Sequence, residues 1–486
     1  MRKVYLVLAL VAALCFNLPA FAADSAGIGI ETFSEILEDI ESLHLSKPDQ
    51  AELLQGAVDG MIDSLEDPYT EYLAPRELED FNDSINGNYA GVGIQLEPGE
   101  QYPQAVGTIK GTPAEKAGVL PGDLILKVDG VDTLEQPLGE VVQKIRGPEG
   151  TQVRLTIRRQ STADFELVLV RANINNPTVS WEVLADGAGY IRVNSFGNNT
   201  AEEFREALDG LLQEGADSLI LDLRDNPGGL LDTAVQLAGE FLDPGQVVVS
   251  TADRDSDRKV YRTKGKPAAK GLETVVLVNQ YSASASEILA GALQDYNAAI
   301  LAGSRTYGKG TVQMVVPLEA GGALKLTIAE YRTPLDRKIA GTGLSPDYQV
   351  ITPALQLLSA QRLLKPAGPN TLILENVNNE ALVNGETVQT KQSMLQYNGT
   401  IYLPLRFALE ALGYRVDWQA ADSSVKVTGH GTSAVYCTGE GECTGTVAGA
   451  APLLTKDGAV YIPLAGLGDL GINYRSEDGK VYIEKN

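Results

Sequence analysis

A serine-rich segment and a glycine-flanked lysine are the residues of this chain best suited to nucleophilic chemistry. Residues 279–288 are NQYSASASEI, and residues 307–313 are YGKGTVQ. A serine hydroxyl becomes a nucleophile only when a neighbouring base takes its proton. The chain has only two histidines, His44 and His430, and neither lies near these segments in the sequence. If one of the serines is a nucleophile, we therefore expect its base to be lysine.

Lysine accepts a proton only in its neutral form. An unperturbed lysine has a pKa of about 10.4, so a base acting near neutral pH needs a pKa lowered by roughly three units, or about 4 kcal/mol. Burial away from water lowers the pKa of a lysine, and Lys309 lies between two glycines beside an apolar strand. Gln313 is neutral and can orient the amine without restoring its charge.

Backbone N–H groups that could stabilise an oxyanion are also present. The loop that follows the apolar run 218–223 contains Gly228 and Gly229, whose amides can approach a substrate closely. The amide of Ala285 lies at the expected start of a helix, where the helix dipole assists. The pattern does not choose among Ser282, Ser284 and Ser286 as the nucleophile.

The same segments allow other interpretations. Residues 282–286 have the composition of a flexible linker, but an apolar strand precedes them and a helical pattern follows. Residues 303–310 nearly match a phosphate-binding loop, although Gly310 replaces the required Ser or Thr and a strand-like run follows instead of a helix. Residues 423–426, SSVK, have the S-x-x-K spacing of penicillin-recognising enzymes, but they lie on an expected strand in another domain.

Alternating strands and helices are expected around these segments. Strands are predicted at 218–223, 274–278 and 298–302, and helices at 200–214 and 285–296. Thr200 and Glu203 have the spacing of a capping box. This order favours an α/β core with parallel strands, whose active-site groups lie beyond the carboxyl ends of the strands.

The composition limits the partners and the location of the chain. The length of 486 residues indicates several domains, and a formal net charge of −25 argues against nucleic acid or an acidic membrane surface as a partner. Residues 1–22 have the features of a signal peptide cut after Ala22; an uncleaved membrane anchor is the alternative. Cys437 and Cys443 are expected to form a disulfide, since their spacing excludes a CxxC metal or redox site.

Three further regions flank or precede the α/β core. Residues 27–84 carry apolar residues at helical spacing on either side of Pro48, which suggests a helical unit, a dimerisation or lid element. Residues 86–170 have short strands and glycine turns. Beyond a linker at 365–369, residues 401–405 are echoed by residues 460–464, a repeat typical of a scaffold.

Together these motifs resemble those of the carboxy-terminal processing peptidases, serine proteases that work outside the cytoplasm. The match rests on SASASEI at 282–288, YGKGTVQ at 307–313 and DLRDNPGG at 222–229. Stretches at 65–73, 91–130 and 341–347 agree, so the resemblance covers roughly residues 30–365.

The resemblance implies a ClpP/crotonase-like protease core at 173–366 and assigns roles within it. Ser284 is then the nucleophile and Lys309 the general base, with Gln313 orienting the lysine. Gly229 (or Gly228) and Ala285 would supply the oxyanion hole. Asp295 matches a position with a supporting role; an ordinary carboxylate at a helix end is the alternative.

Residues 86–170 are similar to a PDZ domain, in which a peptide adds to a sheet edge and its carboxylate is held by loop amides. Here those amides are expected to be Gly91, Val92, Gly93 and Ile94. Arg146 matches an arginine that in some relatives couples peptide docking to the protease; a solvated surface arginine is the alternative. Residues 372–486 look like envelope stalk domains related to the copper amine oxidase N-terminal domain, with no copper ligands implied.

The sequence therefore predicts a multidomain α/β protein with an inserted PDZ domain, a helical N-terminal unit and an α+β stalk. We expect an exported serine endopeptidase, secreted or attached to a bacterial cell envelope, that recognises protein or peptide C-termini and needs no cofactor or metal. A homodimer is consistent with the N-terminal unit, and membrane contact is expected only if the leader is retained. The competing hypothesis is a catalytically inactive PDZ scaffold or adaptor.

Overall fold

The computed structural model describes residues 29–99, 101–160, 162–175, 177–366, 369–375, 379–421, 423–437 and 453–485. The predicted leader and Cys443 lie outside these residues. The chain divides into two compact units, one formed by residues up to Tyr72 with Leu324–Leu326 and the other by the rest. The described part of the chain contains no helix that is long and apolar enough to cross a membrane.

The first unit contains two helices on either side of Pro48, as the sequence predicts. Helix α2 spans Ile30–Leu43 and helix α3 spans Gln50–Asp63, where the Asp49 side chain caps the first turn. Neither helix has a buried residue. Their apolar side chains are instead exposed, as Ile36 and Met61 illustrate.

The second unit begins with helix α4 (Pro75–Asn86) and a small β domain. Strands β3 (Ile94–Glu97), β4 (Gln104–Thr108), β5 (Leu124–Val128), β7 (Gln152–Arg158) and β8 (Phe165–Val170) form its sheet in that order, and β6 (Val131–Asp132) pairs with β5. Helices α5 (Pro113–Lys116) and α6 (Leu138–Ile145) accompany the sheet. This domain has its own apolar core, in which Val92, Ile125, Val141 and Leu155 are buried. A further pair of strands, β2 (Asn88–Gly91) and β9 (Ala172–Asn175), is antiparallel.

A six-stranded sheet organises the α/β core. Its order is β10 (Val179–Val183), β11 (Gly189–Val193), β12 (Ser218–Asp222), β15 (Glu273–Val278), β16 (Ile300–Gly303) and β19 (Tyr348–Gln349). All neighbours from β11 to β19 are parallel, as predicted, and only β10 is antiparallel.

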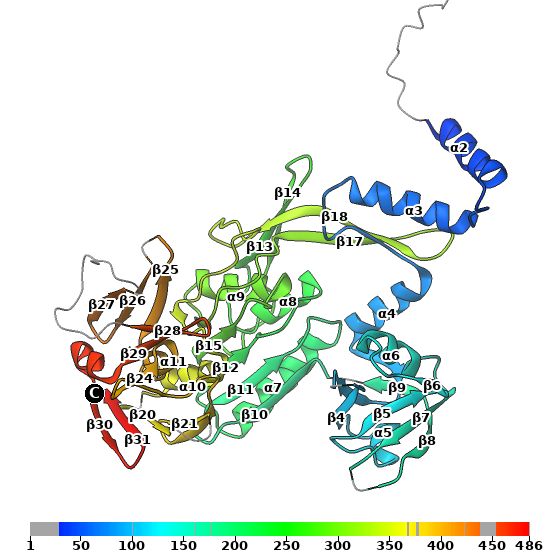
Figure 1. Cartoon of the computed structure of the whole chain (residues 1–486). Helices are drawn as coiled ribbons and strands as arrows, with labels where there is room; N and C mark the ends of the chain where they lie inside the picture. The colour runs from blue at the N-terminus through cyan, green and yellow to red at the C-terminus, as the bar shows by residue number, and fades with distance from the viewer. Residues whose placement is uncertain are drawn as a thin grey trace, which may run out of the picture. The chain divides into compact units, whose positions relative to one another are not determined.

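Alternate residues of these strands face two different apolar cores, because side chains in a strand alternate between its faces. On β12, Leu219 and Leu221 pack with helices α7 (Thr200–Gln213), α8 (Leu231–Ala238) and α9 (Ala285–Asp295). Ile220 faces the other way and packs with helix α10 (Pro353–Leu364). The sheet is therefore covered by helices on both faces (Figure 1).

A second sheet contributes to the site described below. Strand β13 (Val247–Asp253) pairs with β14 (Arg258–Arg262) and with β18 (Ala323–Arg332), and β17 (Thr311–Pro317) pairs with β18. Because β17 is a strand directly after Gly310, the phosphate-binding-loop interpretation of residues 303–310 is wrong.

The described part of the C-terminal domain combines three antiparallel sheets with two short helices. Its strands are β20 (Asn370–Glu375), β21 (Glu380–Val383), β22 (Glu386–Gln389), β23 (Leu395–Tyr397), β24 (Thr400–Pro404), β25 (Arg415–Gln419), β26 (Ser424–Gly429), β27 (Thr432–Cys437), β28 (Leu454–Lys456), β29 (Ala459–Pro463), β30 (Asn473–Glu477) and β31 (Lys480–Lys485). The two copies of the sequence repeat form β24 and β29, which pair with each other. Each is followed by a helix, α11 (Leu405–Ala411) or the 3₁₀-helix η1 (Leu464–Leu470). Cys437 is disulfide-bonded.

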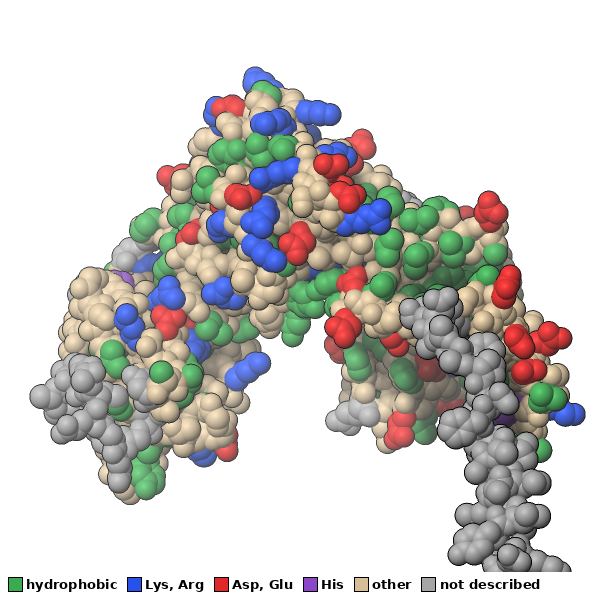
Figure 2. All heavy atoms as spheres, turned by 90° about the horizontal axis from the view of Figure 1, so that it is seen from above, with side chains coloured by type: hydrophobic (Ala, Val, Ile, Leu, Met, Phe, Trp, Pro, Cys, Tyr) green, Lys and Arg blue, Asp and Glu red, His purple; other side chains and the backbone are tan. Residues whose placement is uncertain are grey.

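The capping-box prediction at Thr200 is wrong, because Asn199 occupies the cap and the Glu203 carboxylate instead accepts hydrogen bonds from the backbone of Thr178 and Val179. The net negative charge is not gathered into one patch on the face seen in Figure 2, where lysines and arginines lie among the carboxylates.

Candidate active site

Ser284 lies at the junction between the core sheet and helix α9. Strand β15 ends at Val278, a loop follows, and α9 begins at Ala285. Ser284 has φ 55° and ψ −115°, a conformation that non-glycine residues rarely adopt. Such strain persists only where the surroundings enforce it, and it is concentrated at functional sites.

The two flanking serines have structural roles. Ser282 is fully buried, and its hydroxyl donates to the Leu223 carbonyl at 2.7 Å. Ser286 is also fully buried, and its hydroxyl donates to the Asn226 carbonyl at 3.0 Å. Both bonds fasten the serine segment to the loop that follows β12. Among the three serines, only Ser284 is partly exposed and strained.

The Glu287 carboxylate connects Ser284 to Lys309. One of its oxygens accepts hydrogen bonds from the backbone N–H groups of Ser284 (3.1 Å) and Lys309 (2.9 Å). The other accepts from the Thr306 hydroxyl and the Gly308 N–H. Since Ser284 and Lys309 share one oxygen atom, their backbones are held close together. Burial raises the pKa of the fully buried Glu287 carboxyl, although these four hydrogen bonds oppose the shift.

The Tyr331 hydroxyl forms a second bridge between the same two residues. It lies 3.3 Å from the Ser284 carbonyl and also donates to the Lys309 carbonyl. Tyr331 is almost completely buried on strand β18, and its own N–H donates to the Gly310 carbonyl. The Ser284 and Lys309 backbones are therefore fixed by a carboxylate on one helix and a phenol on one strand.

The glycines beside Lys309 allow a neighbouring loop to pack closely. A Cβ atom on Gly308, which has φ +89°, would lie 2.9 Å from the Gly343 nitrogen. A Cβ atom on Gly310 would lie 2.3 Å from the Ala340 nitrogen. Such contacts exclude any side chain. Lys309 itself is half-buried, near the end of the loop that leads into β17.

The loop after β12 presents its glycines to the same place. A Cβ atom on Gly228 would lie 2.8 Å from both the Ser284 Cβ and the Ala285 nitrogen. The Gly228 N–H is occupied, because it donates to the Asn226 side chain at 2.8 Å. Within the described residues, the N–H groups of Gly229 and Ala285 donate no hydrogen bond. Of the two glycines, Gly229 thus has the available donor.

Two other predicted residues make contacts elsewhere. The Gln313 amide nitrogen donates to the hydroxyls of Thr311 (2.9 Å) and Thr327 (3.2 Å). The Asp295 carboxylate is buried, pairs with Arg337 and accepts the Leu335 N–H at 2.8 Å. Asp295 therefore secures the loop after β18 rather than the serine.

The predicted peptide-binding loop lies between β2 and β3. The carbonyls of Val92 and Gly93 accept hydrogen bonds from Ala114 and Ile109, and the N–H groups of Val92 and Gly93 donate none within the described part of the chain. Arg146 ends helix α6, with its guanidinium 4.7 Å from the Tyr89 ring centroid and 3.9 Å from the Asp80 carboxylate. Its Nε is buried without a partner among the described residues.

The arrangement around Ser284 is suited to acyl transfer. It combines a strained serine at a helix N-terminus, a half-buried lysine and two N–H donors, the groups that nucleophilic catalysis requires. The described residues contain no group of three or more His, Cys, Asp or Glu side chains that could hold a metal ion. Sequence reasoning missed the bridging roles of Glu287 and Tyr331. The spacing of Ser284 and Glu287 is that of a capping box and could have indicated the first.

Four family models match the chain. Residues 187–350 match peptidase family S41, residues 106–159 match the PDZ domain, and residues 382–483 match the copper amine oxidase N-terminal domain. Residues 23–76 match the N-terminal domain of the activating protease CtpB.

Curated relatives also match the chain. A probable CtpA-like serine protease of Staphylococcus aureus (strain COL) is 34% identical over 390 residues, covering 80% of this chain and 73% of the relative. The corresponding Staphylococcus haemolyticus protein (strain JCSC1435) is 37% identical over 318 residues, covering 65% of this chain and 64% of the relative, just under two thirds of its length. A photosystem II D1 C-terminal processing protease structure is 30% identical, covering 68% of this chain and 96% of its own, with a TM-score of 0.42.

Proposed function

Since the chain belongs to peptidase family S41, together with the CtpA-like serine proteases, we propose that it is an active endopeptidase in which Ser284 is the nucleophile and Lys309 the general base. The observation that carries this proposal is the strained Ser284 at the start of α9, tied through Glu287 to the backbone of Lys309.

The proposed reaction proceeds through an acyl-enzyme. The Ser284 oxygen attacks the scissile carbonyl while its proton passes to the neutral Lys309 amine. The N–H groups of Gly229 and Ala285 stabilise the resulting oxyanion, and the ammonium returns its proton to the departing amine. Lys309 then takes a proton from water, whose oxygen attacks the ester, and gives this proton to the departing Ser284 oxygen, which restores the free serine and the neutral amine. Gln313 orients the lysine once its side chain turns from Thr311 and Thr327.

Cleavage of an unstructured polypeptide with an apolar C-terminus tests this function. We expect the chain to cleave it and the Ser284→Ala variant to leave it intact. If neither protein cleaves while both bind the polypeptide, the chain acts as a PDZ scaffold instead.

We also propose that the PDZ domain captures the C-terminus of the substrate. The N–H groups of Val92 and Gly93 are available to a carboxylate, which loop amides of this kind bind. In this proposal Arg146 couples docking to the rest of the chain, and its contacts with Tyr89 and with Asp80 of α4 support that role.

Changing Gly93 to alanine should weaken capture without affecting the chemistry. Gly93 has φ +79°, and a Cβ atom there would lie 2.5 Å from the Thr112 side chain. The loop must therefore shift, and we expect KM for a tagged polypeptide to rise by about tenfold while hydrolysis of a short untagged peptide is unchanged. Gly111→Ala is the matched control, since Gly111 has φ +81° but no neighbouring atom within 4 Å. Equal kinetics for the two variants would contradict a role of the loop in capture.

We also propose that the chain forms a homodimer through its N-terminal helices. Helices α2 and α3 are amphipathic but bury no residue, and Ile36, Leu54 and Met61 are 45%, 41% and 64% exposed. Sedimentation should show a dimer that dissociates when Ile36 and Met61 are both changed to aspartate. A parent chain that sediments as a monomer would exclude the homodimer.

We further propose that the protein is exported to the cell surface of a bacterium, where the C-terminal domain acts as a stalk. The leader at 1–22 and the relatives in Staphylococcus support this location. The mature protein should begin after Ala22, and a disulfide should join Cys437 to Cys443. Peptide mapping of protein from the culture medium and the cell envelope tests both statements; recovery only from cytoplasm would contradict export.

A further inference from the structure

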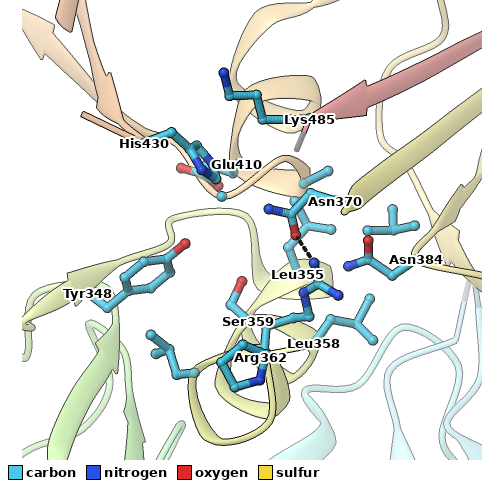
Figure 3. Close-up of a pocket in the computed structure, with 15 residues that line it drawn as sticks. Tyr348, Leu355, Leu358, Ser359, Arg362, Asn370, Asn384, Glu410, His430 and Lys485 are labelled. Carbon is cyan, nitrogen blue, oxygen red and sulfur yellow. Dashed lines mark hydrogen bonds between the residues drawn. The ribbon is translucent and has the colours of Figure 1, made fainter. Parts of the chain in front are cut away.

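A cavity away from Ser284 lies where helix α10 meets the C-terminal domain (Figure 3). Its volume is about 340 Å³, in the range of sites for small molecules. It is lined from α10 by Leu355, Ser359 and Arg362, and from the C-terminal domain by residues that include Asn384 and Lys485. Tyr348 comes from the last strand of the core sheet.

The walls of this cavity belong to one packed structure. Leu355 of α10 is buried in the apolar core of the C-terminal domain, whereas Ala360 and Leu364 pack on the core sheet. The buried Glu410 carboxylate of the C-terminal domain accepts hydrogen bonds from the N–H groups of Ile351 and Thr352, just before α10. Helix α10 is thus packed against both the core sheet and the C-terminal domain, which fixes the positions of the polar groups that line the cavity.

Several hydrogen-bond donors on these walls have no acceptor among the residues that the structure describes. Within the described residues, the hydroxyls of Tyr348 and Ser359 and the amide nitrogen of Asn384 make no hydrogen bond, although all three residues are half-buried. Figure 3 shows Tyr348 and Ser359 directing their oxygens into the same space. Burial, with Glu410 second, raises the pKa of Tyr348, so its hydroxyl keeps its proton at neutral pH. Donors held in this way favour a ligand that brings acceptors.

The charges on the walls are predominantly positive. Arg362, which donates to the Asn370 side chain at 2.6 Å, and Lys485, which donates to the Leu470 and Gly471 carbonyls, both line the cavity. Glu410 is the acidic lining residue, and its charge is compensated by Arg406 at 3.2 Å and by the two backbone N–H groups. Arginine is well suited to the flat array of oxygens on a carboxylate or phosphate.

We propose that this cavity binds a small anion with a carboxylate or phosphate group, held by Arg362, Tyr348, Ser359 and Asn384. The apolar side chains of Leu355 and Leu358 provide a surface for a short hydrocarbon part. The ligand would contact the core sheet, α10 and the C-terminal domain at once, so it would stabilise their packing. This site is independent of peptide cleavage.

Calorimetric titration of the full-length Ser284→Ala chain with inorganic phosphate and, separately, with butyrate at constant ionic strength tests the proposal. We expect one anion to bind each chain, and the preferred probe identifies phosphate or carboxylate as the ligand group. Arg362→Gln should weaken binding at least tenfold, and Tyr348→Phe should weaken it three- to fivefold. Arg254→Gln is the control, because the Arg254 side chain is 91% exposed.

Arg362 also contacts Asn370, so its replacement could disturb folding. If Arg362→Gln does not fold, the Tyr348→Phe, Ser359→Ala double variant tests anion binding instead, because it removes only two hydroxyl groups. Circular dichroism checks that this variant is folded. Absence of binding by both probes, or binding unchanged in the folded double variant, would overturn the proposal.

Discussion

Replacing Lys309 by alanine is expected to lower kcat by about a hundredfold to ten-thousandfold, since general-base catalysis contributes roughly 10²–10⁴. KM should change little, because the amine acts on the serine proton rather than on substrate binding. Lys309→Arg should be equally inactive, since a guanidinium does not release its proton at any accessible pH. Steady-state cleavage of a short peptide measures all three proteins.

The neighbouring Lys338 provides the control for this experiment. It is an exposed lysine that pairs with Glu330, so Lys338→Ala should keep the parental rate. In the parent chain kcat/KM should rise with pH as the Lys309 ammonium loses its proton, with an apparent pKa well below that of free lysine. A profile that is flat between about pH 6 and pH 9, or a Lys309→Ala variant with the parental rate, would exclude lysine as the base.

Replacing Glu287 by glutamine is expected to cause the second largest loss. Each carboxylate oxygen of Glu287 accepts two hydrogen bonds. In the glutamine variant an NH₂ group replaces one of these oxygens, and because this group is a donor it cannot accept the two hydrogen bonds that the oxygen accepted. Unfolding free energy should fall by about 2–4 kcal/mol. The loops that carry Ser284 and Lys309 should also separate, and a displacement of about 1 Å is enough to lower kcat by roughly a hundredfold.

Glu410 offers a matched comparison for this variant. It is also a buried glutamate on a helix, and it accepts backbone hydrogen bonds and pairs with Arg406. Glu410→Gln should lose comparable stability yet keep its kcat at a temperature where both variants are folded. Denaturant unfolding and kinetics on the same samples provide the two measurements. Equal losses of kcat in both variants would show that Glu287 acts through stability alone.

Local sequence patterns predicted much of the fold. The apolar runs at 218–223 and 274–278 and the helix after Ala285 appear close to their expected bounds, and the order of elements correctly indicated parallel pairing. The short strand β19 and the antiparallel strand β10 were not predicted, since sheet pairing decides their form. Glu203 shows the limit of local spacing, because its carboxylate binds a strand segment distant in the sequence.

The parts of the candidate site that lie within short sequence segments could be predicted. Residues 282–286 and 307–310 could be identified as a unit, but the sequence pattern alone did not choose among the three serines. The hydrogen bonds of Ser282 and Ser286 to the loop after β12 form only in the folded chain. Tyr331 could not be predicted, because β18 reaches the site through its pairing with β13 and β17, which forms only in the folded sheet.

Detection of the acyl-enzyme tests the central claim most directly. A slowly turned-over peptide ester is mixed with the chain, quenched in acid during turnover and examined by denaturing mass spectrometry. We expect a mass increase equal to the acyl part of the substrate, mapped to the peptide containing Ser284 and absent from Ser284→Ala. An adduct on another residue, or cleavage by the Ser284→Ala variant at the parental rate, would contradict it.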